Sequence, residues 1–202
     1  MTTDWESRYR NGDTPWCKGR PHPMLSPMID RLLPAVFAGR VLVPGCGRGW
    51  DLAAIATARP AATVIGIDVS QAALNDVAGH VRDHPRIELV FGDFLDAAWL
   101  NGAVGKVDFL WEHTCFCAID PSTRTDYVAS AAAVLKPGAL LAGVFFVDLD
   151  DEGHGPPWNC PQPQLESHFS ASFDVEHCEL ARDTFEGRHA EEYEVRMRRR
   201  AE

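Results

Sequence analysis

Apolar residues along this chain form two kinds of segment. Short, nearly continuous runs of β-branched and other apolar residues are typical of strands that are buried on both faces. These runs are residues 40–43, 63–67, 87–91, 107–111 and 139–147. Between them apolar positions recur at helical spacing, as at Leu74, Val77 and Val81 after the good N-capping residue Ser70. Strand and helix in repetition predict a parallel sheet with helices on both faces.

The C-terminal part of the chain shows a different pattern. Two further strands are predicted at 172–180 and 191–198. In the second, Tyr193, Val195 and Met197 alternate with charged residues, which is typical of an antiparallel edge strand with one solvated face. The sequence therefore predicts an α/β, Rossmann-like fold with a mostly parallel seven-stranded sheet that ends in an antiparallel C-terminal hairpin.

Length and composition predict one soluble domain spanning residues 1–202. Apolar residues make up 46% of the 202 residues and charged residues 24%, an ordinary globular balance. The apolar run 139–147 is too short to cross a bilayer, and the first ten residues do not resemble a signal peptide. We therefore expect a cytoplasmic protein without membrane association, present as a monomer or weak dimer.

The charge and the cysteines narrow the chemistry further. A net charge of −10 argues against a nucleic-acid partner, and the short basic stretch 196–200 is more consistent with a solvated strand end. The six cysteines contain no C-x-x-C pair, so we expect neither a disulfide framework nor a metal site.

Two segments interrupt the alternation of strands and helices. The first lies within residues 1–24 and is rich in Trp, Pro and Gly, and the second covers 148–163 with a similar composition. Tryptophan is costly to leave exposed, and ligands of open parallel sheets bind outside the carboxyl ends of the strands. We predict that residues 1–24 form an N-terminal lid and that 148–163 form an active-site loop.

A glycine-rich loop follows the first predicted strand. Gly45, Cys46, Gly47, Arg48 and Gly49 lie between a strand that ends near residue 43 and a helix that begins near residue 50. Glycines here permit a tight turn and a close approach of the backbone to a ligand. The spacing is G-x-G-x-G, whereas the dinucleotide fingerprint is G-x-G-x-x-G. Because the gap that seats a pyrophosphate is shortened, the loop favours S-adenosylmethionine over a nicotinamide dinucleotide.

Acidic residues at the ends of the next two strands complete a nucleoside site. Asp68 ends the second strand and can accept hydrogen bonds from both ribose hydroxyls, with Val69 beside it. Asp93 and Phe94 follow the third strand. There Asp93 can accept the adenine amino group while Phe94 packs on the ring, although an ordinary Asp-capped turn is the alternative.

Several further motifs together resemble the thiopurine, thiol and halide methyltransferase family, which has the class I methyltransferase fold. The matching segments are 12–16 (GDTPW), 43–51 (VPGCGRGWD), 66–70 (GIDVS), 92–94 (GDF), 114–119 (TCFCAI), 121–124 (P-x-x-R), 135–138 (LKPG) and 155–157 (GPP). The resemblance implies S-adenosylmethionine as donor, S-adenosylhomocysteine as product, and a thiol or related sulfur nucleophile of a small molecule as acceptor. A halide or thiocyanate acceptor on the same scaffold is the alternative.

The acceptor remains open because this chain departs from the family at four pocket positions. Halide-methylating members tend to have Asp-Tyr where this chain has Glu112 and His113, and Tyr where it has Trp158. Asp often follows Thr-Pro-Trp in the family, where this chain has Cys17.

Six further residues complete the predicted site. Trp16 is a candidate to face the sulfonium cation and to line the acceptor pocket, or to pack within the lid. Glu112 and His113 are candidate general bases that would take the proton of a thiol. In the alternative, Glu112 binds the methionine amine or loop backbone and His113 lines the acceptor pocket. Substrate contacts are further predicted for Phe116, Arg124 and Trp158; core packing is the alternative for the two aromatic residues and a surface salt bridge for Arg124.

Overall fold

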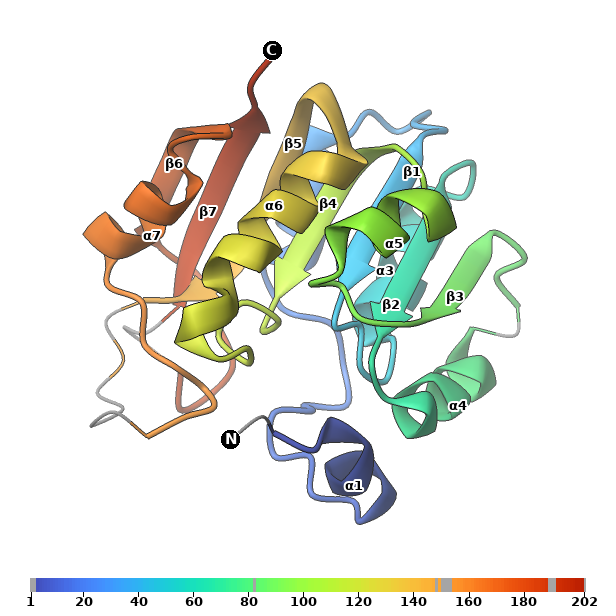
Figure 1. Ribbon diagram of the computed structural model, residues 1–202. Coiled ribbons are helices and arrows are strands. Elements are labelled where there is room, and N and C mark those ends of the chain that lie inside the picture. The colour runs from blue at the N-terminus through green and yellow to red at the C-terminus, as the bar shows by residue number, and fades with distance from the viewer. Residues whose placement is uncertain (1–2, 82, 148, 150–153, 189–191, 202) are drawn as a thin grey trace.

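The computed structural model (Figure 1) describes residues 3–81, 83–147, 149, 154–188 and 192–201. A seven-stranded sheet has the order β3-β2-β1-β4-β5-β7-β6, in which β1 to β5 are parallel and β7 runs antiparallel to both neighbours. The strands are β1 (Arg40–Pro44), β2 (Thr63–Asp68), β3 (Ile87–Phe91), β4 (Val107–His113), β5 (Leu135–Phe146), β6 (Phe173–Leu180) and β7 (Glu192–Arg199). The predicted fold is confirmed.

Helices cover both faces of the sheet. They are α1 (Trp5–Arg10), α2 (Leu25–Leu32), α3 (Trp50–Ala58), α4 (Gln71–His80), α5 (Ala97–Ala103), α6 (Arg124–Val134), α7 (Gln162–Phe169) and the 3₁₀ turn η1 (Pro121–Thr123). Helices α5, α6 and α7 pack on one face, and α2, α3 and α4 contribute to a separate core on the other (Figure 1). The Ser70 hydroxyl accepts a hydrogen bond from the Ala73 amide, which confirms the predicted N-cap of α4.

Successive side chains of β4 point alternately into the two apolar cores. Leu110 belongs to the core under α5 to α7, whereas Phe109 and Trp111 belong to the core under α2 to α4. Side chains in a strand point to opposite faces in turn. Glu112 therefore faces the α6 side and His113 faces the α3 side, which decides what each of them can contact.

The charged face of strand β7 is solvated only in part. Arg198 is exposed and Arg196 half-buried, but Glu192 and Glu194 are 1% and 5% exposed. The chain beyond the sheet covers these carboxylates: Glu192 bonds to His22, and Glu194 forms an ion pair with Arg31 of α2. The predicted edge position is wrong, because β6 rather than β7 forms the edge of the sheet.

The fifth strand begins earlier than its apolar run suggests. Helix α6 ends at Val134 and β5 starts at Leu135, which pairs with Val107 before the register shifts. Residues 136–138 thus lie inside the strand, where Gly138 adopts a φ of 78°. Within the described residues, no helix has the length and apolarity needed to cross a membrane.

Helix α1 lies beyond the carboxyl ends of the strands, apart from the layers of the sheet (Figure 1). Its Glu6 accepts hydrogen bonds from the Ser70 hydroxyl at 2.8 Å and from the Ala72 amide at 3.0 Å. A carboxylate is favourable at this position because it satisfies a free amide in the first turn of α4. The N-terminal segment is thereby fixed against the helix that follows Asp68.

Candidate active site

A cavity of about 670 Å³ opens where β1, β2 and β4 end. Its volume lies within the range of about 300–1,000 Å³ that is usual for small-molecule sites. Its lining includes most of the residues that the sequence predicts for the site, namely Trp16, Gly45, Cys46, Gly47, Asp68, Val69, Asp93, Phe94, His113 and Trp158. Gly49, Glu112, Phe116 and Arg124 do not line it.

The glycine loop forms a close backbone cradle at one side of this cavity. Gly45 and Gly47 have φ values of 55° and 53°, a conformation that favours glycine. A Cβ atom at Gly47 would lie 2.7 Å from the Tyr9 hydroxyl, and one at Gly45 would lie 3.1 Å from the Cys115 side chain. Gly49 supports the turn from outside, since a Cβ there would meet Val77 of α4 at 2.6 Å. A side chain at any of these three glycines would therefore crowd its neighbours and disturb the loop.

Asp68 lies next to this cradle and is 7% exposed. Its Oδ2 accepts a hydrogen bond from the Gly47 amide and its Oδ1 accepts one from the Ser70 amide, each at 2.9 Å. Each carboxylate oxygen keeps acceptor capacity for a further donor, as two ribose hydroxyls require. Phe94 is 4% exposed and packs 4.9 Å from Tyr127, so its ring is a fixed part of the wall. The site thus fits an adenosine.

The N-terminal segment covers the glycine loop with aromatic rings. Trp16 donates from Nε1 to the Tyr9 hydroxyl at 3.2 Å, and it meets Trp5 edge-on at 5.3 Å between ring centroids. The Arg8 guanidinium lies 4.4 Å from the centroid of Trp16. One face of Trp16 therefore already holds a cation, which leaves at most the opposite face for a sulfonium.

Glu112 lies beneath the cavity. It is 1% exposed, and its Oε1 accepts hydrogen bonds from the amides of Cys115 and Phe116 at 2.8 and 2.9 Å. Its Oε2 bonds to the Tyr127 hydroxyl of α6. The carboxylate thereby holds the turn after β4, in which Thr114 has a strained φ of 65°, as the loop-backbone alternative expects. The catalytic and cofactor-binding roles of Glu112 stay predictions.

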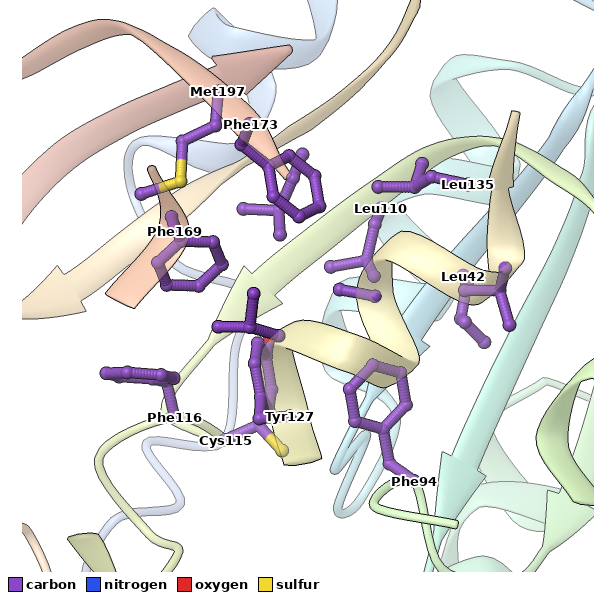
Figure 2. Close-up of a cluster of buried hydrophobic side chains, with 14 of the residues drawn as sticks. Leu42, Phe94, Leu110, Cys115, Phe116, Tyr127, Leu135, Phe169, Phe173 and Met197 are labelled. Carbon is purple, nitrogen blue, oxygen red and sulfur yellow. The ribbon is translucent and has the colours of Figure 1, made fainter. Parts of the chain in front are cut away.

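Phe116 and Arg124 also lie outside the cavity. Figure 2 shows Phe116 in the apolar core beside Phe169 and Tyr127, and its ring centroid lies 5.6 and 5.2 Å from theirs. Arg124 is 3% exposed and donates to the backbone oxygens of Trp158 and Asn159 at 3.2 and 2.8 Å. The predicted substrate contacts of these two residues stay predictions. In this structure Arg124 anchors the loop that presents Trp158 to the cavity.

The predicted active-site loop 148–163 is only partly described. Positions 148 and 150–153 of this prediction lie outside the described residues, as do positions 1–2 of the predicted lid. Gly155, Pro156, Pro157 and Trp158 line the cavity. The Trp158 amide donates to the Cys117 oxygen at 2.8 Å, so this part of the loop is tied to the turn after β4.

His113 forms a dyad with Asp51, the second residue of α3. The two residues are joined by a 2.8 Å hydrogen bond between Nδ1 and Oδ2. Asp51 also accepts from Trp111 Nε1 at 2.8 Å and from the His22 amide at 3.0 Å. Although burial opposes ionisation, the interaction with His113 and the hydrogen bonds from Trp111 and the His22 amide hold the pKa of Asp51 below its usual range. An ionised carboxylate only accepts, so Nδ1 of His113 carries a proton.

This tautomer leaves the other ring nitrogen of His113 with its lone pair. Nε2 is shielded from solvent and has no hydrogen-bond partner within the part of the chain that the structure describes. A buried nitrogen without a partner is costly unless it serves a ligand. The Asp51–His113 dyad therefore resembles the arrangement by which a carboxylate orients a catalytic histidine.

A second histidine lies beside the dyad. His22, His113 and Glu192 offer ligand atoms within 4.8 Å of one another, a composition that could suit a metal ion. However, His22 Nδ1 accepts a hydrogen bond from the Met24 amide at 3.1 Å, so its proton is on Nε2, which donates to Glu192 at 2.9 Å. Binding a metal through Nε2 would require that proton to leave and the Met24 bond to break. The observed bonds thus favour a hydrogen-bonded network over a metal site.

The network around Glu192 predicts a loss of stability in acid. Burial alone would raise the pKa of Glu192, but hydrogen bonds from His22 and Thr184 and the charge of Arg188 lower it from 4.5 to about 2. Between these values the unfolded chain binds a proton that the native protein does not, so stability falls as pH falls from about 4.5 to about 2. We expect Glu192 to contribute ~2–3 kcal/mol of this loss.

Unfolding by urea at several pH values measures that contribution. Glu192→Gln should be less stable than the parent protein at pH 6 and should show a shallower decline below pH 4.5. Glu88→Gln, on the other edge of the sheet, is the matched control and should keep the parent slope. An acid slope in Glu192→Gln equal to that of the parent protein would contradict the assignment.

Several residues that line the cavity, including Asp51, Arg20 and the three described next, are not predicted from the sequence. Tyr9 comes from α1, and Phe185 and Arg188 come from the connection between β6 and β7. Phe185 stacks against His113 with centroids 6.2 Å apart and an interplanar angle of 26°. Nothing local in the sequence marks Phe185 or Arg188, because they are brought to the site by the antiparallel return of the chain.

Comparison with known proteins agrees with this geometry. Residues 1–200 match the sequence model of the Thiopurine S-methyltransferase (TPMT) family. "Probable thiol methyltransferase 2" of Arabidopsis thaliana is 31% identical over 163 residues, which is 80% of this chain and 69% of the relative. "Thiocyanate methyltransferase 1" of Brassica oleracea is 33% identical over 76% of this chain and 66% of its own length. The aligned part thus spans about two thirds of these plant relatives.

Solved structures share the fold. A structure described under "Conversion of a Disulfide Bond into a Thioacetal Group during Echinomycin Biosynthesis" superposes with a TM-score of 0.76 and 19% identity, over 99% of this chain and 93% of the other. The N-methyltransferase NodS from Bradyrhizobium japonicum, in complex with S-adenosylhomocysteine, superposes with a TM-score of 0.72 and 15% identity, over 96% and 97% of the two chains. With the family match and the adenosine-shaped cradle, the chain belongs to the thiopurine S-methyltransferase family and is an S-adenosylmethionine-dependent methyltransferase.

Proposed function

We propose that this enzyme methylates the sulfur of a small-molecule thiol that reaches the site protonated, and that His113 is the general base. The observation that carries the proposal is the Asp51–His113 dyad with its unpartnered Nε2. The names of the plant and animal relatives, which include thiol and thiopurine S-methyltransferases, support sulfur as the atom methylated.

The residues of the cradle are proposed to hold the donor. The amino-acid part of the donor would contact Gly45, Cys46 and Gly47. Its ribose hydroxyls would donate to Asp68, and its adenine would contact Val69, Asp93 and Phe94. When bound, S-adenosylmethionine supplies an electrophilic methyl group on a sulfonium. Trp16 and Trp158 line the cavity from two separate loops and would exclude water from the donor and the acceptor. Holding two reactants in line can contribute roughly 7–11 kcal/mol of rate acceleration.

His113 would convert the acceptor to its reactive form. A free thiol has a pKa of about 8.5, so only a minority is thiolate at neutral pH. Nε2 of His113 would take the thiol proton, and the imidazolium formed would be stabilised by Asp51 at Nδ1. Asp51 is a positioning residue in this scheme, because it keeps the tautomer in which Nε2 can accept a proton.

A base distinguishes thiols from the alternative acceptors. Halide and thiocyanate ions carry no proton at neutral pH, so a general base would add nothing to their methylation. A screen with methyl-labelled donor should therefore show higher kcat/KM for thiols than for thiocyanate or iodide at pH 7. Faster methylation of thiocyanate or iodide than of every thiol tested would overturn the proposal.

We further propose that the partner is a free small molecule rather than a nucleic acid, and that the enzyme works in the cytoplasm as a monomer or weak dimer. The net charge of −10 supports the first point, since phosphate-backbone affinity comes from Lys and Arg.

A further inference from the structure

Two guanidinium groups lie over one aromatic ring beside the proposed base. The guanidinium carbons of Arg20 and Arg188 are 5.3 and 5.4 Å from the centroid of Phe185. The same ring stacks on His113 at 6.2 Å. All four residues line the cavity. The guanidinium groups of Arg20 and Arg188 therefore contact the same aromatic ring as His113.

The two arginines differ in their partners. Arg188 donates to Glu192 at 3.0 Å and to the Trp16 backbone oxygen at 3.2 Å, so its charge is paired. Arg20 has neither a hydrogen bond nor an ion pair with any other described residue, and the same holds for Lys18, which also lines the cavity. In a chain with a net charge of −10, two uncompensated cations at the mouth of one cavity indicate an anionic ligand.

The carboxylates of the cavity wall do not compensate these cations. Asp51 is hydrogen-bonded to His113 and Trp111, and Asp68 accepts a hydrogen bond from the glycine loop. Asp93 accepts from the Leu95 amide at 2.8 Å. Asp120 accepts from the Ser122 amide and hydroxyl at 2.9 and 2.7 Å. Each acid of the described cavity wall thus has its own donor elsewhere.

The Arg20 guanidinium is free to bind a carboxylate. Its carbon lies 5.3 Å from the Phe185 ring centroid, and its N–H groups have no hydrogen bond to another described residue. A guanidinium presents its N–H groups as a fork that matches both oxygens of a carboxylate. Lys18 would add a second positive charge at the cavity mouth.

We propose that the acceptor of this enzyme carries a carboxylate in addition to its thiol, and that Arg20, assisted by Lys18, binds this carboxylate while the thiol lies at His113. The inference rests on the proposed function and names the class of acceptor for the same site.

A matched pair of substrates tests the charge directly. 3-Mercaptobenzoate and 3-mercaptobenzamide have nearly the same size and place a thiol at the same position, but only the first is an anion. With saturating donor, the ratio of kcat/KM for the acid over the amide should exceed one and should fall about tenfold in Arg20→Gln, the loss of one charge-assisted contact. Added salt should reduce the ratio in the parent enzyme because Arg20 is exposed.

Arg86→Gln is the matched control. It removes the same charge from an exposed site just before β3, at the amino end of the sheet and outside the cavity. This variant should keep the acid-to-amide ratio of the parent enzyme. An equal fall of the ratio in Arg86→Gln and Arg20→Gln would overturn the proposal, because the preference would then reflect net charge alone.

Calorimetry distinguishes the proposed carboxylate site from binding of the cofactor carboxylate by Arg20, and its failure from a failure of the proposed function. 3-(Methylthio)benzoate should bind the enzyme–S-adenosylhomocysteine complex more weakly in Arg20→Gln than in the parent protein. Weaker binding of S-adenosylhomocysteine itself, with an unchanged acid-to-amide ratio, would assign Arg20 to the cofactor carboxylate and overturn the proposal. If the methylated acid binds in an Arg20-dependent way while neither thiol is methylated, the carboxylate site is supported and the proposed function fails.

Discussion

Replacement of His113 by glutamine is expected to lower kcat/KM for a weakly acidic alkanethiol by about 10²–10³-fold, the range of general-base catalysis. Glutamine keeps a polar side chain of similar reach but cannot accept the thiol proton. The loss should shrink for acidic arylthiols, which are already ionised at neutral pH and need no base. Steady-state rates across a series of thiols of graded pKa, measured at saturating donor, give the dependence.

Two companion variants define the cause of that loss. Asp51→Asn should reproduce the same dependence on thiol pKa, and the ¹⁵N shifts of the His113 ring should show loss of the Nδ1-protonated tautomer. His177→Gln on β6, whose side chain is outside the cavity, should behave like the parent enzyme. A His113→Gln loss that is equal for all thiols would assign His113 to acceptor positioning and remove it as the base.

The parts of the fold and site that the sequence predicts are those encoded locally. The glycine loop, Asp68 and Asp93 each follow a predicted strand within a few residues, and parallel strands bring their carboxyl ends to one edge of the sheet. The position of a motif next to the end of a parallel strand can therefore be predicted from the sequence. The acidic face of β7 fails this rule, because the chain that covers Glu192 is about 170 residues away and leaves no local signal.

The residues at the end of β4 show where local reasoning was incomplete. Glu112 and His113 are adjacent, so the sequence treats them as equivalent candidates for the base. The alternation of β4 separates them, since Glu112 follows Leu110 to the α6 side and His113 follows Trp111 to the α3 side. Applied to the sequence, the same alternation would have pointed His113 toward Asp51. The partner itself lies 62 residues away, and only the packing of α3 brings it within bonding distance.

Substitution of Asp68 by alanine is expected to weaken binding of S-adenosylhomocysteine by about 10–100-fold. The ribose hydroxyls would lose charge-assisted acceptors worth ~1.5–3 kcal/mol in total. The Gly47 and Ser70 amides would also lose their acceptor, so the loop that forms the cradle would be less fixed. Isothermal titration of the ligand into parent and variant protein measures the change, and thermal unfolding without ligand reports the contribution of the loop alone.

The neighbouring Asp76→Ala is the control for this experiment, because Asp76 is exposed on α4, pairs with Arg48 and does not line the adenosine cavity. It should leave the affinity for S-adenosylhomocysteine within about twofold, as expected for a surface ion pair. If Asp68→Ala retains parental affinity while remaining folded, the carboxylate does not hold the ribose. The adenosine would then have to lie elsewhere in the cavity. The proposed positions of the sulfonium, and of the acceptor thiol at His113, are inferred from the same pose and would have to change as well.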